Sequence, residues 1–178
     1  MLHTRFTTLL GCTVPLQQAG MGGVATAPLA QAVADAGALG MLSGVLVPPP
    51  VLAEILDDLG ARTRGVFGVS FLMPFLELEA VAVAATRARA VEFFYGDPDA
   101  ELVAAVHAGG AFAAWQVGSV AEALAAEDAG CDLVIAQGTE AGGHVRGRIA
   151  LRPRPDRRRA GRRRGGAAPA LVSGLTRG

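Results

Sequence analysis

Residues 129–144 read AGCDLVIAQGTEAGGH, and this stretch contains the pattern that decides the fold class. Gly130 is placed to end a helix, and the apolar run at residues 132–137 leads into a loop rich in glycine. A short apolar run bounded in this way is typical of a strand that is buried on both faces of a parallel sheet. The stretch therefore predicts one β-strand of an α/β fold, followed by a loop at the carboxyl end of that strand.

The same alternation of apolar runs and helical stretches fills the rest of residues 1–147. Further strands are predicted at residues 14–19, 39–43, 66–72, 91–95 and 111–117. Helices are predicted between them, at residues 28–36, 48–60 and 78–89, from Asp97-Pro98 onwards, and from Ser119 to Gly130. Strands separated by helices of about 10–15 residues imply right-handed crossovers and a parallel sheet. By spacing alone, six such units fit either an open doubly wound sheet or a TIM barrel, which has eight.

The composition is that of a folded α/β domain. Hydrophobic residues, mostly Ala, Val and Leu, make up 51% of the chain and aromatic residues only 5%, which suits buried parallel strands and alanine-rich helices. No apolar run approaches the ~18 residues of a membrane span, and the first residues lack the pattern of a secretory signal. Cys12 and Cys131 are far apart and lack metal-ligand spacing, so they are expected to be reduced thiols. These features predict a cytoplasmic protein without a metal site.

The formal net charge of zero hides two oppositely charged parts. Residues 1–147 contain six arginines and fifteen acidic residues, whereas residues 148–178 contain ten arginines and a single acidic residue, Asp156. Such a division marks two physically different segments. We therefore expect residues 1–147 to form the folded domain, and residues 148–178 to be a tail rich in Arg, Pro and Gly without regular structure.

Two of the predicted loops are candidates for a ligand site, because parallel α/β folds bind ligands at the carboxyl ends of their strands. The first is Gln17-Gln18-Ala19-Gly20-Met21-Gly22-Gly23. Its glycines would let the backbone approach a flat or anionic ligand, and a backbone N–H could donate to a ring nitrogen. A tight turn without a ligand would explain the same residues equally well.

The second candidate loop follows the strand at residues 132–137. Gln137 ends the strand, Gly142 and Gly143 follow in the loop, and His144 comes next. The imidazole of histidine titrates near neutral pH, so a histidine in a cleft can act as a general acid or base. An exposed loop histidine without a role is the alternative, but the convergence of these residues after one strand favours a site.

At these two loops the chain resembles the nitronate monooxygenases, formerly called 2-nitropropane dioxygenases. The resemblance covers about residues 10–147 and rests on PLQQAGMGGVA at 15–25, LAQAVADAGALG at 29–40 and AGCDLVIAQGTEAGGH at 129–144. It implies an α/β (β/α)8 TIM barrel of the FMN-binding type, of which this chain would contain about six βα units. It also implies oxidation of alkyl nitronates by molecular oxygen to a carbonyl compound and nitrite.

The resemblance assigns roles to particular residues. The cofactor site would be formed by Ala19, Gly20, Met21, Ser70, Gln137, Gly142 and Gly143. The backbone of the first three would face the isoalloxazine ring of FMN, and Gly143 would let the chain pass close to it. His144 would be the catalytic base or the group that orients the substrate. Ser70 is a departure, because the family usually places there an asparagine that reaches the flavin, and serine is shorter.

A larger departure follows Gly147. Family members continue with two further βα units, whose glycine-rich loops hold the FMN phosphate. Here residues 152–166 read RPRPDRRRAGRRRGG. An abrupt change to Arg, Pro, Gly and Ala is what translation of GC-rich DNA out of frame would produce, and the absence of lysine fits such a source. The alternative is a basic arm that binds nucleic acid or an acidic surface. We favour the out-of-frame interpretation, so nucleic acid is not an expected partner.

Other functions stay open beside the nitronate monooxygenase. FMN-dependent enoyl-acyl-carrier-protein reductases share the loop at residues 140–144, but they tend to have an acidic residue where Gln137 stands. Gln137 therefore favours the oxygen-using enzyme. An inactive fragment is the remaining alternative. The expected partners are a small nitronate and oxygen, with no membrane, while the physiological substrate and the oligomeric state stay open.

Overall fold

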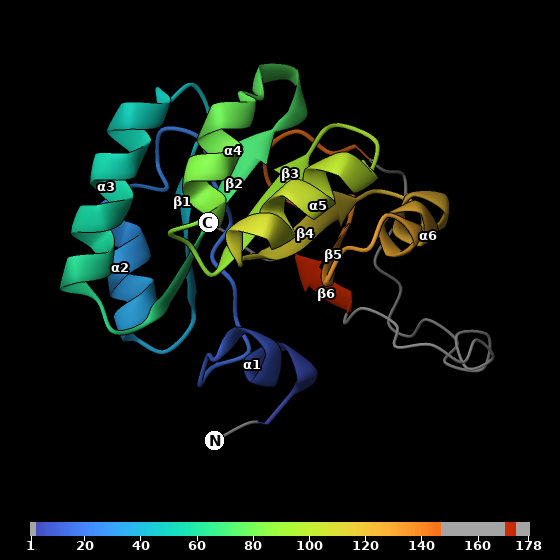
Figure 1. Ribbon diagram of the computed structural model, residues 1–178. Coiled ribbons are helices and arrows are strands. Elements are labelled where there is room, and N and C mark those ends of the chain that lie inside the picture. The colour runs from blue at the N-terminus through green and yellow to red at the C-terminus, as the bar shows by residue number, and fades with distance from the viewer. Residues whose placement is uncertain (1–2, 147–169, 174–178) are drawn as a thin grey trace.

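The computed structural model describes residues 3–146 and 170–173. Its strands form one parallel sheet in the order β1-β2-β3-β4-β5-β6, so each strand lies beside the one that precedes it (Figure 1). They are β1 Leu39–Ser43, β2 Val66–Leu72, β3 Ala90–Phe94, β4 Phe112–Val117, β5 Leu133–Gln137 and β6 Ala170–Ser173. A doubly wound sheet reverses its strand order at a switch point, whereas a barrel does not. The fold is therefore that of a TIM barrel, of which the described residues form a part.

Helices connect the strands and pack along one face of the sheet (Figure 1). The helices are α1 Arg5–Leu10, α2 Ala27–Asp35, α3 Pro49–Arg62, α4 Leu78–Ala85, α5 Ala100–Gly109 and α6 Val120–Asp128, with a short 3-10 turn, η1, at Met73–Phe75. Side chains cap the amino ends of several of these helices by hydrogen bonding. The carboxylate of Asp99 accepts hydrogen bonds from the first turn of α5, and the hydroxyl of Ser119 accepts one from the first turn of α6.

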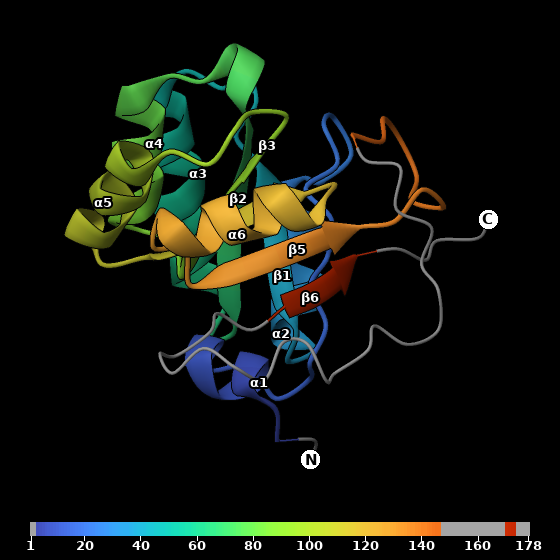
Figure 2. The ribbon, with the colours of Figure 1, turned by 90° about the vertical axis from the view of Figure 1, so that its right-hand side faces the viewer.

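The apolar residues form two layers, one on each face of the sheet. The outer layer packs strand residues such as Phe93 and Trp115 against helix residues such as Leu56. The inner layer, on the face that a barrel encloses, contains Leu39, Met41, Ala90, Ala114, Leu133 and Ile135. Phe6 and Leu10 join this inner layer from α1, which lies at the amino ends of the strands (Figure 2). α1 does not cover the opposite ends of the strands, the carboxyl ends, where a ligand site can form.

The strands predicted at 39–43, 66–72, 91–95, 111–117 and 132–137 are confirmed, with bounds that agree within one residue. The strand predicted at 14–19 is wrong, because only Gln17 bridges to Leu39 there. Pro15 has no N–H to donate to a ladder. The N–H groups of Thr13 and Val14 both donate to the carbonyl of Gly37, so the segment begins as a turn.

Three helices differ from the prediction. α3 continues through Gly60 and ends at Arg62, and α4 ends at Ala85, before the predicted end at residue 89. α4 ends early because Arg89 already pairs with β2. The N–H of Arg89 donates to the carbonyl of Phe67 in that strand. α1 was not predicted, because its six residues are too short for a periodic pattern.

The tail contributes a strand to the sheet. β6 pairs in parallel with β5, with Ala136 beside Val172 and Gln137 beside Ser173. The prediction that residues 148–178 lack regular structure is therefore wrong at Ala170–Ser173. The basic run at residues 152–166 lies outside the described residues.

The two cysteines agree with the sequence prediction. Cys12 and Cys131 are both free and buried, as expected for reduced thiols. In the described part of the chain, no helix is both long and apolar enough to cross a membrane.

Candidate active site

The first candidate loop, at residues 17–23, runs beside β1 and turns at the carboxyl end of that strand. The side-chain amide of Gln18 donates to the carbonyl of Met41 at 2.9 Å. The N–H of Ser43, the last residue of β1, donates to the carbonyl of Ala25 at 3.2 Å. These bonds hold the intervening backbone at residues 19–21 against the strand, while Ala19 and Met21 stay exposed.

Gly20 and Ser70 are fifty positions apart in the sequence but in direct contact in the fold. A Cβ atom built on Gly20 would overlap the Cβ of Ser70 and lie 2.6 Å from its hydroxyl oxygen. Ser70 lies in β2 and is only 3% exposed. A residue other than glycine at position 20 would therefore push the loop away from the sheet. The close approach brings two residues of the predicted cofactor site together.

Below this contact lies a buried carboxyl group. Glu92 of β3 is the cross-strand neighbour of Ser70 and is 4% exposed. The side-chain amide of Gln17 donates to its Oε2 at 2.6 Å. Burial raises the pKa of the Glu92 carboxyl to about 7, although the hydrogen bond from Gln17 acts in the opposite direction. The carboxyl thus ties the first loop to the inner face of the sheet.

Sequence reasoning missed Glu92. The run at residues 91–95 was interpreted only as an apolar strand, and a single glutamate in it attracts no attention. The available signal was the alternation of side chains along a strand, because Glu92 shares a face with Ala90, and Ala90 belongs to the inner apolar layer. A carboxyl on that face has to be buried.

The second candidate loop is held by Gln137, the last residue of β5. Gln137 is 4% exposed. Its Nε2 donates to the carbonyl of His144 at 3.2 Å, and its Oε1 accepts from the N–H of Arg146 at 3.0 Å. Gln137 therefore uses both ends of its amide to close the loop. A carboxylate could accept the second bond but could not donate the first.

The last two glycines and the histidine of this loop are exposed. Gly142, Gly143 and His144 all lie at the surface. Gly143 has a φ of 76°, in the left-handed region that favours glycine, and a Cβ atom there would meet nothing within 4 Å. The backbone conformation, and not a close approach to other protein atoms, thus accounts for glycine at this position.

Two residues that the sequence did not single out hold His144 in place. The hydroxyl of Tyr95, just after β3, donates to the carbonyl of His144 at 2.7 Å. The guanidinium of Arg146 forms ion pairs with Asp97 at 2.5 Å and with Glu122 at 3.3 Å. The loop after β5 is therefore anchored to the loop after β3 and to α6.

The predicted site residues thus form two groups at the same edge of the sheet. Gly20 and Ser70 make one group at the carboxyl ends of β1 and β2, with Ala19 and Met21 beside them. The loop from Gln137 to His144 makes the other at the carboxyl end of β5. Parallel α/β folds bind ligands along this edge.

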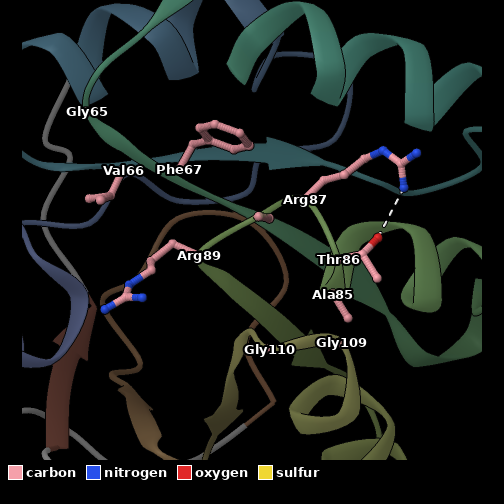
Figure 3. A pocket seen from close by; sticks show the side chains of 10 residues that line it. Gly65, Val66, Phe67, Ala85, Thr86, Arg87, Arg89, Gly109 and Gly110 are labelled. Carbon is pink, nitrogen blue, oxygen red and sulfur yellow. Dashed lines mark hydrogen bonds between the residues drawn. The ribbon is translucent and has the colours of Figure 1, made fainter. Parts of the chain in front are cut away.

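The opposite edge of the sheet contains a shallow pocket near the amino ends of β2 and β3 (Figure 3). It is lined by residues 65–67, 85–89 and 109–110. Its two arginines are engaged with the protein. Arg87 pairs with Asp57 at 2.9 Å, and Arg89 donates to the carbonyl of Leu10 at 3.0 Å. Residues at this edge of a barrel serve stability, so we do not assign a ligand to the pocket.

No group of three or more His, Cys, Asp or Glu side chains within residues 3–146 could hold a metal ion. The chemistry available at the carboxyl edge is that of exposed backbone, a serine hydroxyl, an amide and an imidazole.

The sequence of this chain is similar to those of known proteins. The family model described as "Nitronate monooxygenase" matches residues 3–81 and 76–156. A (3aS,4S,5R,7aS)-5-hydroxy-7a-methyl-1-oxo-octahydro-1H-indene-4-carboxyl-CoA dehydrogenase from Mycobacterium tuberculosis is 33% identical over 81% of this chain and 41% of its own. A nitronate monooxygenase from Pseudomonas aeruginosa is 31% identical over 79% of this chain and 51% of its own.

A solved structure agrees with these sequence matches. FabK from Thermotoga maritima superposes with a TM-score of 0.76 at 31% identity, over 82% of this chain and 47% of that chain. The chain spans about half the length of the relatives that it matches. Because the family match extends over more than half of the residues, it identifies the family. This chain belongs to the nitronate monooxygenase family.

Proposed function

We propose that this chain supplies the flavin-facing loops of an FMN-dependent nitronate monooxygenase, which oxidises alkyl nitronates with molecular oxygen to a carbonyl compound and nitrite. The family supports a flavin-dependent oxidoreductase. The observation that carries the proposal is the contact of Gly20 with the buried Ser70 beneath an exposed stretch of backbone. A backbone without a side chain at this point can approach a flat ring closely.

The residues at the carboxyl edge suit a flavin. The exposed residues Ala19 and Met21 and the half-buried Gly20 present backbone groups, and Ser70 offers a hydroxyl that can donate or accept. The Oε1 atom of Gln18 is buried and accepts no hydrogen bond within the part of the chain that the structure describes. A buried acceptor without a partner is costly, so a bound donor would stabilise it. Ala19, Gly20, Met21 and Ser70 would hold one side of the ring system.

FMN, when bound, would supply the electron transfer. The chain would supply position and proton handling. His144 is exposed at the same edge, and an imidazole there can take or give a proton near neutral pH. Gln137 holds the main chain of His144, and the open space beside Gly143 would leave room for the flavin or substrate next to the imidazole.

A dehydrogenase or reductase that acts on a thioester is the second candidate. The name of the relative from Mycobacterium tuberculosis specifies a carboxyl-CoA dehydrogenase, and its identity of 33% exceeds the 31% of the nitronate monooxygenase from Pseudomonas aeruginosa. The enoyl-acyl-carrier-protein reductase belongs to the same class. Against it stands Gln137, whose amide donates to His144 as an acidic residue could not.

Turnover assays on the FMN-loaded 178-residue chain separate these candidates. A nitronate monooxygenase consumes oxygen and releases nitrite with an alkyl nitronate, and His144→Ala should lower this rate about a hundredfold or more, as expected for loss of a general base. His3→Ala is the matched control, because His3 is exposed and far from the carboxyl edge. Oxidation of NAD(P)H with an enoyl thioester, or oxidation of an acyl-CoA, without nitronate turnover would overturn the proposal.

A further inference from the structure

Tyr95 has a backbone conformation that tyrosine rarely adopts. Its φ is 63°, in the left-handed region, directly after the end of β3. For a bulky residue such a φ is an outlier, whereas glycine adopts it freely. Strain of this kind persists where the surrounding contacts enforce it, and it clusters at functional sites. The contacts that enforce it therefore have to be identified.

The side chain of Tyr95 is directed at His144. Its hydroxyl donates to the His144 carbonyl at 2.7 Å, and the two rings meet edge to face, with centroids 6.5 Å apart and planes at 83°. On its other side the Tyr95 ring packs on the buried Phe94, with centroids 3.7 Å apart. The side chain thus connects the core of the sheet to the histidine of the candidate site.

This connection crosses the sheet. Tyr95 follows β3 and His144 follows β5, so the side chain spans the carboxyl end of β4. The carbonyl of His144 accepts from two donors, the Tyr95 hydroxyl and the Gln137 amide. Arg146, two residues further on, is anchored separately by Asp97 and Glu122. The loop would therefore stay attached at Gln137 and Arg146 if Tyr95 released it, while His144 would lose part of its support.

We propose that Tyr95 is a positioning residue that fixes the loop of residues 138–146 and sets the orientation of the His144 imidazole at the carboxyl edge. The inference rests on the proposed function, in which His144 handles a proton. It goes beyond that function because it assigns the placement of the imidazole to a residue on another strand. The hydroxyl fixes the main chain, and the edge of the ring limits the rotation of the imidazole.

The signals of these residues are easy to assign, since Tyr95 is the one tyrosine of the chain and His144 is one of three histidines. Two measurements on the 178-residue chain are needed without added cofactor: amide hydrogen exchange over residues 138–146, and the side-chain rotamer of each histidine by NMR. Tyr95→Phe removes the hydroxyl and keeps the ring. Tyr95→Gly removes both and relieves the backbone strain, so it serves as a second variant if Tyr95→Phe fails to fold. Phe75→Leu is the control, an exposed aromatic residue just after β2 at the same edge.

We expect Tyr95→Phe to speed exchange in the loop about fivefold, as the loss of one hydrogen bond implies. Tyr95→Gly should speed it at least as much and should also broaden the distribution of His144 side-chain rotamers. The rotamer of His107, which binds Asp132 at the opposite edge of the sheet, should stay unchanged in both variants. Exchange within about twofold of the parent in both variants, with an unchanged His144 rotamer, would overturn the inference.

Turnover separates the failure of this inference from the failure of the proposed function. If the parent oxidises nitronates, Tyr95→Phe should lower kcat and displace its pH profile while KM changes little. If the parent oxidises no nitronate, the proposed function fails, whereas the exchange and rotamer results still decide whether Tyr95 positions His144. Normal loop exchange in Tyr95→Phe and Tyr95→Gly together with normal nitronate turnover would reject the positioning role alone.

Discussion

Single residues at the carboxyl edge depend on contacts far away in the sequence. Glu92 is buried in the inner face of the sheet and binds Gln17 of the first loop. Gly20 of the same loop lies against Ser70, the strand neighbour of Glu92. The loop that would face the flavin is therefore fixed by a carboxyl below it and by the lack of a side chain within it. Each of these features has a measurable consequence.

The buried Glu92 should make stability depend on pH. Its pKa of about 7 lies above the unfolded value of ~4.3, so the folded state holds more protons between these values and loses stability as the pH rises. The loss should approach about 4 kcal/mol above pH ~7. Denaturant unfolding at several pH values should show this slope in the parent protein and in Glu54→Gln, an exposed control on α3. Glu92→Gln should remove it, and an unchanged slope in Glu92→Gln would refute the assignment.

Gly20 should tolerate no side chain. Gly20→Ala places a methyl group on Ser70 and should destabilise the fold by about 1–3 kcal/mol, because the loop or the strand must shift. Gly22→Ala is the matched control in the same loop, since a Cβ atom there meets nothing within 4 Å. Thermal unfolding of the two variants checks the prediction. Equal melting temperatures would show that the loop does not rest on Ser70.

At the scale of elements, a hydrogen-bonded carboxylate links the neighbouring strands at their amino ends. Oδ2 of Asp132, just before β5, accepts from the N–H of Ala113 in β4 and contacts Nε2 of His107 in α5, both at 2.8 Å. Removal of the carboxylate leaves the Ala113 N–H without this acceptor. One side chain therefore holds together two strands and a helix.

Asp132→Ala should cost about 2 kcal/mol of unfolding free energy, because hydrogen bonds to a charged group are lost and a partly buried donor stays unpaired. Asp128→Ala, an exposed aspartate four residues earlier, should stay within about 0.5 kcal/mol of the parent protein. Urea unfolding of both variants measures the difference. A loss in Asp132→Ala no larger than in Asp128→Ala would mean that the link contributes nothing.

The periodicity of apolar residues in the sequence predicted the strands whose side chains pack in the core. Five strands were predicted within one residue, because each is an apolar run between turn residues. The first strand failed because Pro15 and the turn bonds at Gly37 prevent a ladder, and such local competition does not show in an apolar pattern. Glu92 and Tyr95 were missed because their importance comes from neighbours on other strands. The sequence does not reveal which side chains meet across a sheet.

Across the whole molecule, the two edges of the sheet have different roles. The amino edge is closed by α1, whose Phe6 and Leu10 join the inner layer, and Arg89 binds the carbonyl of Leu10 there. The carboxyl edge contains Ala19, Gly20, Met21, Ser70 and the loop that ends at His144. The amino edge thus contains contacts that stabilise the fold and the carboxyl edge contains the proposed ligand site, the division found in TIM barrels generally. The central claim is that the carboxyl edge binds a flavin.

A titration of the 178-residue chain with FMN, followed by flavin fluorescence and by hydrogen exchange of the protein, tests this claim most directly. The account predicts saturable binding that slows exchange at residues 17–23 and 137–146 and leaves the pocket at residues 85–89 unchanged. It also predicts that Gly20→Ala weakens binding at least about tenfold, while Gly22→Ala does not, because a displaced loop loses its contact with the ring. No saturable binding, or binding that protects the amino edge and is insensitive to Gly20→Ala, would contradict the account.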